Sequence, residues 1–159
     1  MSRTETSADR VRQLPSAAAF LMPTTLGRID YADAFEVRVR RPRDRGAAAW
    51  MRLILEGAPL ATRVRLLAAW SAIGLRLRVP GADGTILGWE IRAEDDDFVL
   101  LGAASSIGMP GQLSLRRRED GLLFATVVRH DNSVARTVWS TIEAAHVRTV
   151  RSLLRRVCC

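Results

Sequence analysis

Residues Leu122–Val157 read LLFATVVRHDNSVARTVWSTIEAAHVRTVRSLLRRV, and they contain the clearest periodic pattern of the chain. Its first part, Leu122 to His130, is predicted as the last strand of a sheet. From Asn132 to about Val157, apolar residues recur at helical spacing, which predicts one long amphipathic helix. The apolar stripe contains Val138, Ile142, Ala145, His146, Thr149, Val150, Leu153 and Leu154, whereas Arg136, Arg148, Arg151 and Arg155 fall on the far side. Asp131 or Asn132 can cap the start of this helix.

Short strand-like runs precede this stretch. We expect strands at Thr85–Ala93, Phe98–Ala104 and Gln112–Arg118, with an acidic turn at residues 94–97. The nearly continuous apolar character of Phe98–Ala104 predicts burial on both faces. Glu119-Asp120-Gly121 predicts a hairpin turn, since glycine after aspartate tolerates a positive φ.

Upstream, the pattern predicts one strand followed by two helices. Residues 28–40 alternate at their end, which indicates a strand with one buried face. The first helix is expected at Gly46–Glu56 with Asp44 as a plausible N-cap, and the second from Pro59 to about Leu77. The expected buried stripe of the second helix contains Val64, Leu67, Ala68, Ser71 and Leu75.

The ends of the chain are expected to lie outside a single domain at residues 26–157. Residues 1–25 are interpreted as a loosely ordered arm with a helical turn near Asp9–Gln13. Phe20, Leu21 and Met22 in this arm need apolar cover, so the arm is a candidate to pack on the domain. Residues 158–159 are interpreted as a frayed tail.

Three stretches carry a family resemblance: DYADAF at residues 30–35, TVVRHDN at residues 126–132, and the last helix with Trp139, His146 and LLRR at residues 153–156. With the order of elements, the chain resembles an uncharacterised bacterial branch of the START/polyketide-cyclase-like (SRPBCC) superfamily. This resemblance implies an α+β helix-grip fold, in which a bent antiparallel sheet wraps around a long C-terminal helix. Members of the superfamily bind lipids, polyketides and other apolar molecules, and some are cyclases or dehydratases. The chain departs from similar sequences at Val134-Ala135-Arg136, where a Gly-Arg pair is more frequent.

Composition restricts the functional classes. The chain has 159 residues, 48% of them hydrophobic, and a formal charge of +7 with arginine as every basic residue. The sequence has no uninterrupted run of about 18 apolar residues, so no membrane span is predicted. We expect a cytoplasmic location. The absence of lysine beside many alanines is typical of GC-rich bacterial coding. Aromatic content of 6% argues against nucleic-acid binding.

Metal and phosphate motifs are not found in the sequence. The only cysteines are Cys158 and Cys159, and they match no disulfide framework or zinc spacing. Asp95-Asp96-Asp97 lacks the alternating spacing of a calcium loop and is interpreted as a solvated turn. No glycine-rich phosphate loop is present. No cofactor and no metal site are therefore predicted, and the sequence gives no indication of oligomeric state.

Three polar residues are candidates for chemistry in a cavity between the sheet and the last helix. His146 lies on the apolar stripe, His130 ends the last strand, and Asp33 flanks Tyr31 just before the first strand. These could transfer protons, or they could be structural residues with backbone and arginine partners. The predicted ligand-binding residues are Tyr31, Trp89, Leu100, Leu113, Phe124, Thr126, Trp139, Ile142 and His146.

Three functions stay open at this point. The first is binding of a small, mostly apolar molecule in the cavity, with the aromatic residues as liners rather than plain core. The second is a cyclase- or dehydratase-like enzyme that uses His146, His130 or Asp33. The third is an arginine-rich interaction protein whose cavity is filled by its own side chains.

Overall fold

The predicted C-terminal helix is present in the computed structural model, which describes residues 10–158. It is α3 (Ser133–Arg155), and the Asn132 side chain caps it by accepting a hydrogen bond from the Ala135 backbone N–H at 2.8 Å. Its inward side includes Ala135, Trp139, Val150 and Leu154. Of the arginines assigned to the far side, Arg151 is half-buried and contacts the Phe35 ring.

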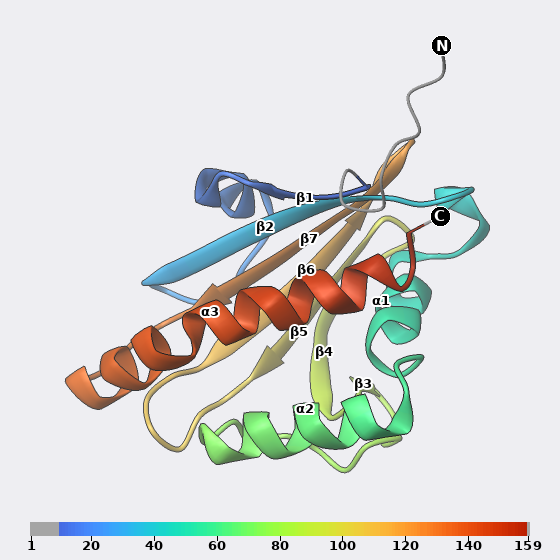
Figure 1. Ribbon diagram of the computed structural model, residues 1–159. Helices are drawn as coiled ribbons and strands as arrows, with labels where there is room; N and C mark the ends of the chain where they lie inside the picture. Colours follow the sequence, from blue (N-terminus) through green and yellow to red (C-terminus); the bar gives the residue numbers. More distant parts are fainter. Residues whose placement is uncertain (1–9, 159) are drawn as a thin grey trace.

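A seven-stranded antiparallel sheet lies behind α3 (Figure 1), so the α+β class with a long closing helix is confirmed. The strand order is β1-β2-β7-β6-β5-β4-β3. The strands are β1 (Val11–Leu14), β2 (Tyr31–Arg38), β3 (Thr85–Ile86), β4 (Trp89–Glu94), β5 (Phe98–Ala103), β6 (Gly111–Arg117) and β7 (Gly121–Val128). Pairing of β2 with β7 joins the start of the fold to its end, and this pairing places both strands against α3.

The sheet face that α3 covers carries the main core. Helix α1 (Ala47–Leu55) packs on the same face and buries Trp50, Met51, Ile54 and Leu55. Phe35, Phe124 and Leu115 are cross-strand neighbours at the centre of this core, and none is more than 2% exposed. Burying one such side chain stabilises the fold by about 1.5–3 kcal/mol.

The opposite face of the sheet is covered by the N-terminal segment. The 3₁₀ helix η2 (Ser16–Leu21) and Met22 pack on Phe98, Leu100 and Leu123. Burial of β5 on both faces is therefore confirmed. Phe20 and Leu21 remain exposed, whereas Met22 is buried.

The predicted helical turn near residues 9–13 is wrong for its described part. Val11–Leu14 form the edge strand β1, which pairs with β2 residues Ala34–Val37. Backbone pairing with an existing strand outweighs the weak local helical preference of this short polar segment. Residues 1–9 lie outside the described part of the chain.

The single strand predicted over residues 85–93 is a hairpin of β3 and β4. Leu87 and Gly88 have φ values of 45° and 85°, and Ile86 pairs with Trp89 across them. Two consecutive positive φ values make a tight turn that matches the twist of a hairpin. Leucine at such a position is unusual, which is why the pattern did not indicate a turn.

The second helix is present as α2 (Leu60–Ala72), but its predicted buried stripe is only partly right. Leu67 packs on the main core and Leu75, beyond the helix end, is buried, whereas Val64, Ala68 and Ser71 are exposed. The side that faces the protein also carries Leu66, Trp70 and Ile73. Apolar residues occur around the whole helix, so periodicity alone could not select the face.

Two predicted turn details are also wrong. Asp44 belongs to the 3₁₀ helix η3 (Pro42–Asp44), and α1 starts after Gly46 without a side-chain cap. Gly121 does not adopt a positive φ. Instead, a Cβ at this position would lie 2.1 Å from the Val37 carbonyl oxygen, so close strand approach requires the glycine.

Two further observations concern the helices and the C-terminal tail. No helix within residues 10–158 combines the length and the apolar character needed to cross a membrane. The Cys158 thiol is half-buried and contacts the Arg155 carbonyl oxygen, and Cys159 lies outside the described residues.

Candidate functional site

A cavity of about 220 Å³ lies between the sheet, α2 and α3. Its lining is mostly aliphatic and aromatic, with a small number of polar side chains. The lining residues are Leu66, Ala69, Trp70, Ile73, Leu75, Trp89, Leu113, Thr126, Val128, Trp139, Ile142, Ala145, His146 and Thr149. An apolar concave lining with few polar groups is typical of small-molecule sites.

A polar cluster of Tyr31, Asp33 and His146 adjoins this cavity. The Tyr31 hydroxyl donates to Asp33 Oδ2 at 2.7 Å, and His146 Nε2 lies 2.9 Å from the same oxygen. Strand alternation places Tyr31 and Asp33 on the face that α3 covers, and the helical stripe brings His146 over them. The structure therefore brings together three residues that the sequence analysis names as candidates.

Asp33 is only 2% exposed, so its carboxyl group needs partners inside the protein. Oδ2 has the two contacts above, whereas Oδ1 has no hydrogen-bond partner among the described residues. Burial is the main cause of a raised pKa for the Tyr31 hydroxyl, and the nearby Asp33 charge raises it further. Tyr31 is therefore a neutral hydrogen-bond donor throughout the physiological pH range.

Aromatic rings form one wall of the site. The Trp139 ring centroid lies 4.7 Å from that of Tyr31 and 5.1 Å from that of His146. On the other side, Trp70 from α2 and Trp89 from β4 meet edge to face at 5.5 Å. These contacts hold the rings in fixed orientations, and they are worth about 0.5–1.5 kcal/mol per pair beyond area burial.

Several buried polar atoms of the lining have no partner among residues 10–158. They are Thr126 Oγ1, Trp89 Nε1 and Trp139 Nε1. Leaving such a group unsatisfied costs about 1–3 kcal/mol. Like Asp33 Oδ1, these atoms are buried in the protein around the cavity.

The cavity brings together most, but not all, of the predicted ligand-binding residues. Those that line it are Trp89, Leu113, Thr126, Trp139, Ile142 and His146. Tyr31 and Phe124 do not line the cavity: the Tyr31 ring contacts the liners Trp139 and His146, and Phe124 lies in the main core. Leu100 lies on the opposite face of the sheet under η2, so its placement as a liner is wrong. Alternation in a strand buried on both faces does not indicate which face is which.

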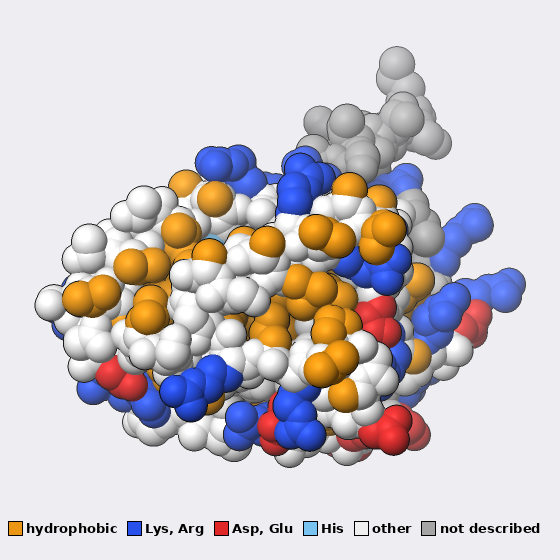
Figure 2. Space-filling model, turned by 90° about the horizontal axis from the view of Figure 1, so that it is seen from below, with side chains coloured by type: hydrophobic (Ala, Val, Ile, Leu, Met, Phe, Trp, Pro, Cys, Tyr) orange, Lys and Arg blue, Asp and Glu red, His pale blue; other side chains and the backbone are white. Residues whose placement is uncertain are grey.

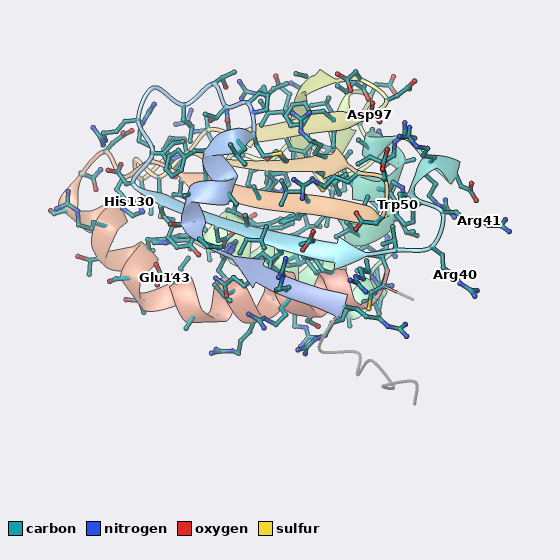
Figure 3. The ribbon with its side chains drawn as sticks, turned by 90° about the horizontal axis from the view of Figure 1, so that it is seen from above. Arg40, Arg41, Trp50, Asp97, His130 and Glu143 are labelled. Carbon is teal, nitrogen blue, oxygen red and sulfur yellow. The ribbon has the colours of Figure 1, made fainter. Side chains whose placement is uncertain are left out.

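His130 does not line the cavity. It lies beyond the end of β7, at the opposite end of the sheet from Trp50 and Asp97 (Figure 3), and its ring centroid is 6.3 Å from that of Trp139. Its backbone N–H donates to Asp30 Oδ2 at 2.7 Å. Burial lowers the pKa of the imidazole, and Nε2 has no partner among the described residues.

The sequence interpretation missed the contribution of α2 to the site. Leu66, Ala69, Trp70 and Ile73 line the cavity, although the stripe was assigned to another side of the helix. The large ring of Trp70, with Leu66 four residues earlier and Ile73 three residues later, was the available signal.

The acidic turn and the basic run are joined by an ion pair, and other arginines of the run have partners on neighbouring strands. Asp97 pairs with Arg117 at 2.8 Å, and Arg118 lies 3.7 Å from Glu36. Arg116 lies over the Phe98 ring. Within residues 10–158, no group of three or more histidine, cysteine, aspartate or glutamate side chains could hold a metal ion.

Comparison of the chain with protein-family models, curated proteins and solved structures gave no match.

Proposed function

We propose that this protein is a helix-grip member of the START/polyketide-cyclase-like superfamily that binds a small, mostly apolar molecule in the cavity between the sheet and α3. The observation that carries this proposal is the apolar and aromatic cavity of about 220 Å³. The pairing of β2 with β7 and the position of α3 across the sheet support the fold assignment.

Burial of ligand carbon would supply most of the binding free energy, at about 25 cal/mol per Å² of apolar surface. The imidazole of His146, which lines the cavity and is 17% exposed, would fix the orientation of a ligand carbonyl or hydroxyl group.

The test uses protein after unfolding, washing and refolding, so that any molecule acquired during expression is removed. Thermal unfolding is measured with and without 1-decanol as an apolar probe. A ligand present at 100 times its Kd stabilises the fold by about 2.7 kcal/mol, which raises Tm by several degrees.

Matched variants locate the effect. Ile142→Trp fills the cavity from α3 and is expected to abolish the rise in Tm, whereas Val134→Trp changes an exposed residue of the same helix and is expected to keep it. No rise in wild-type Tm with 1-decanol or other apolar probes, together with native mass spectra of protein as purified that show only the mass of the chain, would refute the proposal.

The contact between Asp33 and His146 favours a second candidate, a cyclase- or dehydratase-like enzyme. Asp33 engages Nε2, so Nδ1 is the imidazole nitrogen left to exchange a proton with a bound molecule. A carboxylate that orients a histidine is the usual arrangement for a general base.

Proton abstraction beside a carbonyl can be tested with a β-keto thioester in deuterated buffer. Wild-type protein is expected to accelerate exchange of the α-protons, followed by NMR, and His146→Gln is expected to lose this acceleration by about 10²-fold or more. Equal exchange rates with and without wild-type protein would exclude this reaction class.

A further inference from the structure

An open groove of about 460 Å³ runs between α2 and α3, next to the cavity. Leu66, Ala69, Ala145 and Thr149 line both the groove and the cavity. The remaining groove residues are Pro59, Thr62, Arg65, Arg148, Ser152, Leu153 and Arg156. Because the two hollows share a wall of four residues on facing helices, a molecule in the cavity can extend into the groove.

The groove is basic. Arg65 from α2, Arg148 from α3 and Arg156 directly after α3 line it, and none of its lining residues is acidic. Arg156 donates to the Gly57 carbonyl oxygen. Arg65 and Arg148 are exposed and form no ion pair within the described part of the chain, in contrast to Arg117 with its short contact to Asp97.

Apolar and basic surfaces lie close together on this side of the molecule. Figure 2 views the protein from below, the side on which α2 lies in Figure 1, and shows exposed hydrophobic side chains with arginines around them. Leu60 and Val64 of α2 are 67% and 55% exposed. A ligand with both an apolar part and a negative charge matches this combination.

The size of the cavity supports an extended ligand. Small-molecule sites usually enclose about 300–1,000 Å³, and the inner cavity has about 220 Å³. The groove with the arginines adjoins the cavity at four residues, so it is the neighbouring hollow that the rest of a longer ligand would occupy.

We propose that the site binds an amphipathic anion, with its hydrocarbon part in the cavity and a carboxylate or phosphate group on Arg65 and Arg148 in the groove. This inference rests on the proposed binding function and specifies its ligand class. A guanidinium group can donate two parallel hydrogen bonds to either anion, and such charge-assisted bonds are stronger than neutral ones.

The experiment compares four probes that share one alkyl chain: decanoate, decyl phosphate, 1-decanol and decylammonium. Binding is followed by tryptophan fluorescence, since Trp70, Trp89 and Trp139 line the cavity. Measurements are made at about 150 mM salt, where the general attraction of a +7 protein for anions is largely screened. Probe concentrations stay below micelle formation.

The anions are expected to bind about tenfold or more tightly than 1-decanol, and decylammonium more weakly. The double variant Arg65→Gln/Arg148→Gln is expected to weaken anion binding about tenfold and leave 1-decanol binding within about twofold. The matched control is Arg40→Gln/Arg41→Gln, which removes the same charge from two exposed arginines that point away from the domain (Figure 3).

The outcomes separate this inference from the function on which it rests. Equal binding of decanoate, decyl phosphate and 1-decanol, or equal losses in both double variants, would overturn the anion site and leave apolar binding intact. Failure of all four probes to bind wild-type protein would overturn both. Decanoate binding without decyl phosphate binding, or the reverse, supports the inference and identifies the headgroup.

Discussion

Tyr31 is the only tyrosine of the chain, so its ionisation can be followed directly. Burial and the neighbouring Asp33 raise its pKa. Tyrosinate absorbance is therefore expected to appear at higher pH in the native protein than in denatured protein, where the value is about 10. Because the neutral form is favoured by folding, the free energy of unfolding falls as pH rises above about 10.

The same titration in Asp33→Asn provides the control. Removing the negative charge is expected to move the tyrosinate transition toward lower pH, although burial keeps it above the denatured value. Circular dichroism measured in parallel shows whether ionisation accompanies unfolding. Superimposable titration curves for native and denatured wild-type protein would contradict the position of Tyr31 beside a buried carboxyl group.

His130 is expected to make stability depend on pH in mildly acidic solution. Burial lowers its pKa, with Arg136 and Arg28 acting in the same direction and Asp30 and Glu143 opposing them. Protonation therefore costs more in the native protein than in the unfolded chain. The free energy of unfolding should fall as pH decreases from about 6.5 toward the lowered pKa, and His130 contributes no such change above that range.

Urea denaturation between neutral and mildly acidic pH tests this expectation. His130→Gln is expected to flatten the dependence in this range. The pKa values of Asp30 and Asp131 are also lowered, but these groups affect stability in a more acidic pH range. The stability that their carboxylates contribute is lost only below a pH of about 3.9, the pKa of aspartate in the unfolded chain. A pH profile unchanged by the His130 substitution would show that another group causes the acid sensitivity.

Among the elements, the loop that follows η2 is hydrogen-bonded to the sheet through one buried side chain. Gln112 of β6 is 4% exposed. Its amide oxygen accepts from Thr24 Oγ1 at 2.6 Å and from the Thr25 backbone N–H at 3.1 Å, and its amide nitrogen donates to Thr25 Oγ1. Gln112→Ala is expected to destabilise the protein by about 1–3 kcal/mol, since the partners lose their bonds.

Hydrogen exchange resolved by mass spectrometry can locate this loss. Faster exchange is expected in residues 15–26, with little change in α3. The control Ser133→Ala alters an exposed side chain at the start of α3 and should leave both regions unchanged. Uniformly faster exchange throughout the Gln112→Ala protein would indicate a general loss of stability instead of release of one segment.

Elements were predictable from sequence where one face is clearly apolar. The stripe of α3 and the alternation of β2 and β6 indicated both their type and their inward faces. The hydrophobic pattern did not predict elements whose conformation or orientation depends on tertiary contacts. β1 forms because the edge of β2 is available for pairing, and Trp70 of α2 faces inward because it packs on Trp89. The turn at Leu87-Gly88 could not be predicted, because leucine rarely adopts a positive φ.

The site was predictable to the extent that it follows those two clear patterns. Asp33, Thr126 and Leu113 are cross-strand neighbours in one row of the sheet, and His146 lies on the α3 stripe. The groove arginines were not predictable as a set. Arg65 and Arg148 come from helices that are separated in sequence by strands β3 to β7, and only the tertiary fold places both arginines along one groove.

Considering the whole molecule, the cavity lies beside a densely packed core, so the same substitution at two positions of one strand should change stability by different amounts. Leu113 and Leu115 belong to β6 and share one face of the sheet. Leu113 lines the cavity, whereas Leu115 packs between Phe124 and Val99 and is 0% exposed. A phenylalanine at position 113 can place its additional atoms in the cavity, whereas a phenylalanine at position 115 has no such space.

Urea denaturation of the two variants therefore tests whether the hollow exists in solution. Leu115→Phe is expected to lose about 1–3 kcal/mol through overpacking, and Leu113→Phe is expected to stay within about 1 kcal/mol of wild type. Leu113→Phe should also weaken binding of 1-decanol, since the ring occupies ligand volume. Equal destabilisation by both substitutions would mean that the protein closes over the cavity, and the binding function would then lose its physical basis.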